Sequence, residues 1–210
     1  MEPLIQEHEV VLFQGDSITD WGRNYQDGND LGKGYALQTA AWFSALYPER
    51  RVRFINRGIS GNRAVDLRGR WDQDCIALKP TTVSIMIGIN DCWRRYDNND
   101  PTSPGQFEEN YREILSRIRK ELGAKLIICE PFVLPFPEER KQWREDLDPK
   151  IQVVRKLATE FHAVYVPLDG LFAQAAMRTD PAFWTLDGVH PTEAGAALIA
   201  RAWLQAVQAL

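Results

Sequence analysis

The sequence has few of the residues that bind metal ions or form disulfide bonds. Its 210 residues include only three histidines and three cysteines, Cys75, Cys92 and Cys129. The cysteines are odd in number and have no paired spacing, so neither a disulfide framework nor a zinc site is indicated. Two of them, Cys75 and Cys129, lie in apolar stretches and are expected to be small buried side chains. We therefore expect no bound metal ion.

Long apolar runs and an excess of positive charge are also absent. No apolar run is long enough to span a membrane, and residues 1–8 lack the basic region and apolar core of an export signal. Lysine and arginine number 25 against 29 aspartates and glutamates, and the two signs are interspersed. There is no basic stripe for nucleic acid and no glycine-rich phosphate loop. We expect a cytoplasmic protein with no nucleotide cofactor, no membrane partner and no nucleic-acid partner.

Short apolar segments alternate along the chain with segments of helical periodicity. The predicted strands are Val10–Gln14, Val52–Asn56, Thr82–Ile87, Lys125–Glu130 and Val164–Leu168. Between them, apolar residues recur three and four positions apart, as on amphipathic helices. The clearest sets are Ala64, Leu67, Trp71, Cys75 and Leu78, and then Phe107, Tyr111, Ile114, Ile118 and Leu122. This alternation predicts one α/β domain over residues 1–210, a three-layer sandwich with a mostly parallel sheet of about five strands flanked by helices.

The last helix has two interpretations. Pro191-Thr192-Glu193 opens it, with proline in its first turn, and it continues through Ala206 and Val207. It is apolar nearly all round. It is therefore either deeply buried or part of a contact between subunits, which would make the protein a homo-oligomer.

Val133–Pro149 is the least regular stretch. Pro135 and Pro137 break any helix there, and Glu138–Lys141 is expected to form a solvated face. Pro149 follows Asp148, which could cap the helix that comes next, or Pro149 could kink a longer helix that starts near Glu138. The sequence leaves open whether this stretch borders a functional site.

Three chemically complementary residues lie at opposite ends of the chain. Gly15 stops the apolar run at Val10–Phe13, so Ser17 is expected at the carboxyl end of a strand, where open α/β sheets bind ligands. Near the other end, Asp187 and His190 lie three residues apart. A serine hydroxyl becomes a nucleophile when an adjacent base takes its proton and a third group fixes the tautomer of that base. Gly-Asp-Ser alone would indicate only a turn, with Ser17 capping the next helix.

Two further polar segments follow predicted strands. Asn56–Asn62 comes after one strand and Gly88–Asp91 after the next. Attack on an acyl carbonyl creates an oxyanion, which needs preorganised donors. Glycine allows a close approach of a backbone N–H, and asparagine offers a neutral NH₂ donor. Either segment alone would indicate a tight turn, but four such segments in one order favour a catalytic site.

These four segments resemble the motif blocks of the SGNH hydrolases of the GDSL esterase family, over nearly the full length of the chain. The matching blocks are Gly15-Asp16-Ser17, Ser60-Gly61, Gly88-Ile89-Asn90-Asp91 and Asp187-Gly188-Val189-His190. The resemblance implies that Ser17 is the nucleophile, His190 the base and Asp187 its orienting acid. It also implies three oxyanion donors, which are the N–H of Ser17, the N–H of Gly61 and the side chain of Asn90. Ile18 replaces the leucine of the family name, which conserves volume. The implied fold is the flavodoxin-like arrangement of SGNH hydrolases.

Two longer segments of the sequence resemble one group of enzymes within this family. Residues 15–23 and 84–94 are similar to the small intracellular acetylxylan esterases of this family. This implies a serine esterase acting on short acyl groups, chiefly acetyl, on carbohydrates such as acetylated xylo-oligosaccharides. A lysophospholipase or acyl-thioesterase is the alternative, and a non-catalytic carbohydrate-binding protein is disfavoured because all four blocks are intact. The nucleophile elbow of α/β-hydrolases fits worse, since Thr19 stands where that motif has its second glycine.

Several large or charged side chains are close in sequence to the blocks. Trp21, Trp93 and Trp184 each lie within four residues of a predicted catalytic residue, and flat rings with an N–H suit a sugar. The same rings would also suit the core or a subunit interface. Arg63 is one of several arginines near the blocks, which could bind an acidic substrate or form ordinary surface ion pairs. We therefore take Trp21, Trp93, Trp184 and Arg63 as the candidate substrate contacts.

Overall fold

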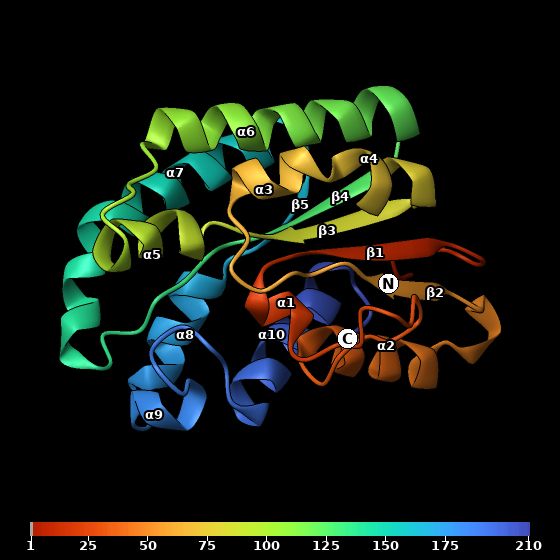
Figure 1. Cartoon of the computed structure of the whole chain (residues 1–210). Coiled ribbons are helices and arrows are strands. Elements are labelled where there is room, and N and C mark those ends of the chain that lie inside the picture. Colours follow the sequence, from red (N-terminus) through yellow and green to blue (C-terminus); the bar gives the residue numbers. More distant parts are fainter. Residues whose placement is uncertain (1) are drawn as a thin grey trace.

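Five parallel strands form the centre of the molecule in a computed structural model that describes residues 2–210 (Figure 1). The strands lie in the order β2-β1-β3-β4-β5, and every neighbouring pair is parallel. Their bounds are β1 Val10–Gly15, β2 Arg53–Asn56, β3 Thr82–Met86, β4 Lys125–Cys129 and β5 Val164–Val166. The predicted parallel sheet is confirmed. Four predicted strands run one or two residues too far at one end, because the apolar pattern continues beyond the sheet, and β1 runs one residue further than predicted.

Helices cover both faces of the sheet (Figure 1). One face carries α3 Ala64–Gly69, α4 Trp71–Asp74, α6 Pro104–Arg117 and α7 Arg144–Glu160, and the other carries α1 Ser17–Asp20, α2 Tyr35–Leu46, α8 Leu168–Ala176, α9 Pro181–Trp184 and α10 Glu193–Ala206. The remaining elements are α5 Ile89–Asp97, the short 3₁₀ segments η1 Pro48–Arg50, η2 Ile76–Leu78 and η4 Glu138–Trp143, and a π-helical turn η3 Ile118–Leu122. The three-layer α/β sandwich predicted from the sequence is confirmed.

Side chains of the strands alternate between two apolar clusters, as the two-residue period of a strand requires. In β1, Val11 and Phe13 pack in the cluster that includes Phe43 of α2 and Trp203 of α10. Leu12 points to the opposite cluster, where it joins residues of α3, α4 and α6. The sheet is therefore buried on both faces, which explains why the sequences of its strands are nearly continuous apolar runs.

Two predicted helical stretches are divided or extended in the structure. The periodic residues 64–78 are shared by α3, α4 and η2, with a break after Gly69, a residue of low helical propensity. Pro149 lies inside α7, which follows η4 directly, so the longer helix is correct and the capping role of Asp148 is wrong. Pro149 is the sixth residue of α7, so it has no N–H to donate to the carbonyl of Glu145 one turn before it.

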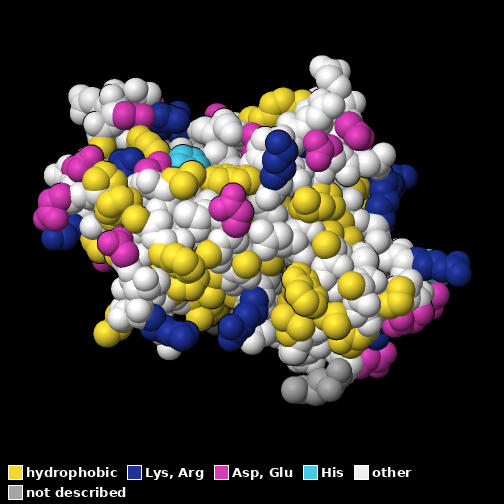
Figure 2. All heavy atoms as spheres, turned by 90° about the horizontal axis from the view of Figure 1, so that it is seen from below, with side chains coloured by type: hydrophobic (Ala, Val, Ile, Leu, Met, Phe, Trp, Pro, Cys, Tyr) yellow, Lys and Arg dark blue, Asp and Glu magenta, His cyan; other side chains and the backbone are white. Residues whose placement is uncertain are grey.

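The last helix, α10, buries one face and exposes the other. Seen from below, the surface of the molecule shows apolar side chains interspersed with charged ones of both signs (Figure 2). Thr192 caps α10 by accepting the N–H of Gly195 at 3.2 Å, so Pro191 precedes the helix instead of lying in its first turn. Its apolar face, with Ile199 and Trp203, packs against the sheet. None of the helices in residues 2–210 combines the length and apolar character that crossing a bilayer requires.

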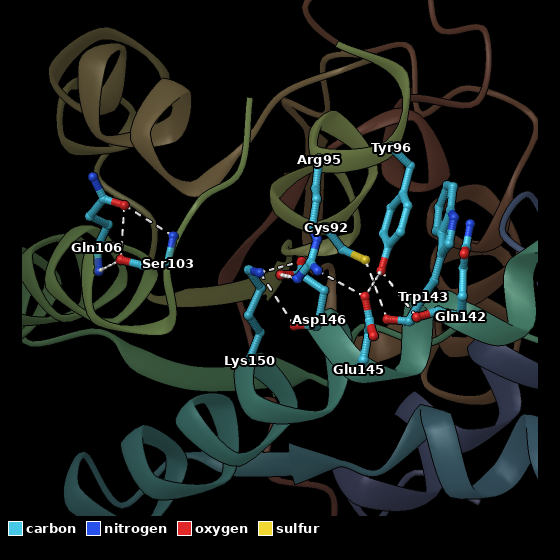
Figure 3. A network of polar contacts seen from close by, with 10 residues as sticks. All are labelled: Cys92, Arg95, Tyr96, Ser103, Gln106, Gln142, Trp143, Glu145, Asp146 and Lys150. Carbon is cyan, nitrogen blue, oxygen red and sulfur yellow. Dashed lines mark hydrogen bonds and ion pairs between the residues drawn. The ribbon is translucent and has the colours of Figure 1, made fainter. Parts of the chain in front are cut away.

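A buried lysine pairs with an aspartate within α7, and the same aspartate pairs with an arginine of α5 (Figure 3). Lys150 is fully buried, and its Nζ donates to Asp146 Oδ2 at 2.5 Å and to the Asp146 carbonyl at 3.3 Å. Asp146 also accepts from Arg95 of α5 at 3.2 Å. Because a buried charge is stable only when it is paired, this contact constrains how the two helices pack.

We expect Lys150→Met to lower the free energy of unfolding by about 3 kcal/mol, because it leaves the buried Asp146 carboxylate without its nearest cation. The double variant Lys150→Met/Asp146→Leu should recover part of this loss. Lys141→Met is the matched control, since the pair it forms with Glu138 is exposed and should change stability by less than about 0.5 kcal/mol. Urea denaturation measures all three, and an equal loss for both single variants would contradict the account.

Candidate active site

A chain of hydrogen bonds joins three residues that are far apart in the sequence. Ser17 Oγ lies 2.9 Å from Nε2 of His190, and Nδ1 of His190 lies 2.8 Å from Oδ2 of Asp187. Burial acts to raise the pKa of Asp187, but the hydrogen bonds it accepts from the His190 ring and backbone and from the Val189 N–H outweigh burial and lower that pKa to about 2. Asp187 is therefore ionised at neutral pH.

The ionised carboxylate fixes the positions of the protons. An ionised aspartate only accepts hydrogen bonds, so the proton between the two side chains belongs to Nδ1 of His190. In the neutral ring Nε2 is then the acceptor, and the Ser17 hydroxyl donates its proton to it. The imidazole is thus held in the tautomer that can remove a proton from a serine.

The loop with Asp187 and His190 is closed by its own backbone contacts. The N–H of Leu186 donates to the His190 carbonyl at 2.8 Å, and Thr185 pairs with Pro191 as an isolated antiparallel bridge. Oδ1 of Asp187 accepts the N–H groups of Val189 and His190 at 3.0 and 2.8 Å. These contacts hold the carboxylate and the imidazole in one local unit, as expected from their short spacing.

Ser17, Gly61 and Asn90 follow three strands that lie side by side. Ser17 is the first residue of α1 directly after β1, Gly61 lies in the loop after β2, and Asn90 lies in the first turn of α5 after β3. Because β1 lies between β2 and β3, these three chain segments leave the sheet at the same edge. The first N–H groups of a helix have no partner within it, which leaves the Ser17 N–H available as a donor.

The geometry at Gly61 and Asn90 suits a donor role. Gly61 has a φ of +81°, a left-handed conformation that favours glycine, and an ideal Cβ there would lie 3.5 Å from the guanidinium of Arg94. The side chain of Asn90 is buried, and its Nδ2 donates one proton to the Asn62 carbonyl at 3.0 Å. The second Nδ2 proton remains for another acceptor. The Asn62 carbonyl therefore fixes the amide of Asn90.

Two buried side chains that the sequence analysis did not single out support this edge of the sheet. Oδ2 of Asp20 accepts the hydroxyl groups of Tyr25 and Ser60 at 2.6 and 2.7 Å, so it fixes the residue before Gly61. Asn56, the last residue of β2, donates from Nδ2 to the Thr19 carbonyl at 2.6 Å. The contacts of Asp20 with Ser60 and of Asn56 with Thr19 join segments distant in sequence, and no local pattern of residues indicates them.

The candidate substrate contacts fall into two groups. The rings of Trp21 and Trp93 flank His190, with ring centroids 6.0 and 5.7 Å from the imidazole. Trp184 instead packs edge-on against Phe183 and lines a separate hollow between α8 and α10. Arg63 forms an ion pair with Asp100 at 2.9 Å. Trp21 and Trp93 are thus the two candidates that lie beside His190.

Comparisons with known proteins agree with this geometry. A family model described as the GDSL-like lipase/acylhydrolase family matches residues 13–198. The chain belongs to this family. The acetylxylan esterase of Geobacillus stearothermophilus is 37% identical over 206 residues, which cover 95% of this chain and 94% of that protein.

Solved structures show the same relationship. A crystal structure of the acetylxylan esterase of Geobacillus stearothermophilus matches with a TM-score of 0.88 at 35% identity, over 97% of this chain and 95% of that chain. An α/β hydrolase enzyme from the metagenome of Lake Arreo in Spain matches with a TM-score of 0.92 at 32% identity, over 100% and 99% of the two chains. The predicted family and the similarity to acetylxylan esterases are confirmed, and this family member is a carboxylic ester hydrolase.

Asp91 ends the Gly-x-Asn-Asp block of the family and is buried in the first turn of α5. Its Oδ2 accepts the N–H of Ala64 at 3.0 Å, which joins α5 to the start of α3. Burial raises the pKa of Asp91 from 3.8 to about 7, and the Ala64 N–H and the charges of Lys150 and Arg63 oppose this rise only in part. The folded protein therefore holds a proton on Asp91 more tightly than the unfolded chain does.

This difference predicts a pH dependence of stability. The contribution of Asp91 to the free energy of unfolding is most favourable below about pH 4, and it is lost as the pH rises toward about 7. Asp91→Asn cannot ionise, so the unfolding free energy of the wild type minus that of the variant should fall between these two pH values and stay constant above them. Urea denaturation at several pH values measures it. A difference that is independent of pH would contradict the assignment.

Proposed function

We propose that this ester hydrolase is a serine esterase that removes short acyl groups, chiefly acetyl, from carbohydrates such as acetylated xylo-oligosaccharides. Ser17 is the nucleophile, His190 the general base and Asp187 the residue that orients the base. The observation that carries the proposal is the continuous hydrogen-bond chain from Ser17 through His190 to an ionised Asp187. The fixed histidine tautomer is the one that this chemistry requires.

The reaction proceeds through an acyl-serine. Ser17 Oγ attacks the ester carbonyl while its proton passes to Nε2 of His190, and the imidazolium is stabilised by Asp187. The tetrahedral oxyanion accepts hydrogen bonds from the N–H groups of Ser17 and Gly61 and from Nδ2 of Asn90. The intermediate then collapses, His190 gives its proton to the departing alcohol, and a water molecule activated by His190 releases the carboxylic acid from Ser17.

The relatives support the roles of these residues. The solved structures of the acetylxylan esterase of Geobacillus stearothermophilus include two catalytic mutants, one with a serine and one with an aspartate replaced by alanine. Another of its variants is described as an acetyl-xylooligosaccharide esterase. A serine and an aspartate also belong to the hydrogen-bond chain of this protein.

The surroundings of His190 support a small acyl group on a sugar. Trp21 and Trp93 flank the imidazole, and such rings offer apolar faces to the C–H groups of a sugar. The preference for a short acyl group is supported by the similarity to the acetylxylan esterase of Geobacillus stearothermophilus.

We expect Asn90→Ala to lower kcat by about 10²–10³ while KM changes little, because the lost hydrogen bond forms only with the oxyanion of the transition state. Steady-state kinetics with an aryl acetate measure both constants. A thermal denaturation curve of the variant checks that its fold is intact. A rise in KM with unchanged kcat would mean that Asn90 only binds the substrate.

We expect acetyl esters to be hydrolysed faster than long-chain esters in a panel of rising acyl length. In the same panel, Trp21→Ala should raise KM for acetylated xylo-oligosaccharides and have little effect on KM for an aryl acetate, because only the sugar contacts the indole. Trp42→Ala is the matched control, since Trp42 is exposed on α2. A preference for long chains would contradict the proposal and favour a lysophospholipase or thioesterase, and an equal loss on both acetyl substrates would assign Trp21 to packing.

A further inference from the structure

Arg140 makes a contact that the sequence of its segment does not suggest. Residues 138–141 are predicted to be a solvated face, and Glu138 and Lys141 do form an exposed ion pair. Arg140, on the same 3₁₀ segment η4, turns inward, and its Nε donates to the carbonyl of Asp187 at 3.1 Å. One side chain therefore reaches from η4 to the backbone of a residue whose carboxylate orients His190.

The guanidinium of Arg140 packs against two indole rings that contact each other edge to face, with centroids 5.0 Å apart. Its central carbon lies 3.8 Å from the ring centroid of Trp143 and 4.4 Å from that of Trp93. A planar guanidinium stacks on aromatic faces while its edge donates hydrogen bonds, a combination that the ammonium of lysine lacks. Contact with both rings thus restricts where the guanidinium can lie.

The indole of Trp143 is itself fixed against α5 (Figure 3). It is almost fully buried and stacks on the ring of Tyr96 with centroids 5.2 Å apart. The hydroxyl of Tyr96 donates to the carbonyl of Gln142 at 3.0 Å, and the thiol of Cys92 donates to that of Trp143 at 3.6 Å. The platform under Arg140 is therefore anchored to the helix that carries Asn90.

The segment before Arg140 contacts the same loop a second time. The N–H of Leu134 donates to the carbonyl of Gly188 at 2.8 Å. Gly188 has a φ of +85°, and an ideal Cβ there would lie 2.1 Å from the carbonyl oxygen of Phe136. Residues 134–140 thus support two successive carbonyls of the loop, those of Asp187 and Gly188.

We propose that Arg140 is a positioning residue for the hydrolysis, which holds the Asp187 peptide and thereby the Asp187 carboxylate in register with His190. It also ties the loop with Asp187 and His190 to α5, so the base and Asn90 keep a fixed relative position. This inference rests on the proposed function of Ser17, His190 and Asp187. Arg140 itself touches no reacting atom.

The test compares Arg140→Ala with Lys141→Ala, which removes a neighbouring cation from the same segment. We expect Arg140→Ala to lower kcat on an aryl acetate by about 10- to 100-fold with little change in KM, because misplacement of the orienting acid slows the chemical step. Lys141→Ala should match the wild type. Millimolar guanidinium should restore part of the lost kcat by binding against the two indoles where the Arg140 guanidinium lay, and ammonium should not.

A spectroscopic measurement separates positioning from fold stability. The low-field proton NMR signal of the Nδ1–H of His190 reports its hydrogen bond to Asp187, and it should broaden or shift in Arg140→Ala and remain in Lys141→Ala. Arg140→Met keeps an apolar side chain against the indoles, and it replaces the alanine variant in these measurements if that variant does not fold.

Two results would overturn the inference. One is an Arg140→Ala or Arg140→Met variant with wild-type kcat and an unchanged low-field signal, whatever its melting temperature. The other is a loss of kcat that guanidinium does not relieve while the signal stays in place. Failure of the proposed function is a different result, because the wild type would then hydrolyse the aryl acetate no faster than Ser17→Ala.

Discussion

The position of β1 between β2 and β3 is the constraint on which the site depends. A parallel sheet brings the carboxyl ends of neighbouring strands to one edge, and the order β2-β1-β3 makes the segments after these strands direct neighbours. Ser17, Gly61 and Asn90 are separated by many residues in the sequence, yet each lies shortly after one of these three strands. The proposed chemistry therefore takes place where the segments after three neighbouring strands meet.

Asp187 and His190 do not follow the central strands, so other contacts must fix their positions. Asp187 and His190 lie in a loop between α9 and α10, and this loop closes on itself through the contact of Leu186 with His190. Residues 134–140 then fix the loop from outside through Leu134 and Arg140. Since a loop is otherwise the most mobile part of a fold, these contacts are what allow a hydrogen bond of 2.9 Å between His190 and Ser17 to persist.

Much of this arrangement could be predicted from the sequence, because its signals are local. An apolar run ended by glycine indicates the end of a strand. This pattern predicted that Ser17 and Asn90 lie just after the ends of two strands. The close spacing of Asp187 and His190 indicated one loop. The parallel sheet followed from the alternation of strands and helices.

The residues that escaped prediction act over long distances in the sequence. Arg140 lies among charged residues that look solvated, and only the fold brings it to Asp187. Asp20 and Asn56 likewise make their contacts with segments that folding brings near. Proximity in sequence was also an incomplete guide for the tryptophans, since Trp184 is three residues from Asp187 but packs toward α8 and α10. A helix or turn between two residues can direct their side chains to different faces.

The central claim is that Ser17 forms a covalent bond during turnover. Incubation with an organophosphonate, followed by intact-mass measurement and peptide mapping, tests it most directly because the reagent stops at the covalent stage. The account predicts one adduct per chain, located on Ser17, with complete loss of activity and no adduct on His190→Ala over the same time. An adduct on another serine, or full activity after Ser17 has been modified, would contradict it.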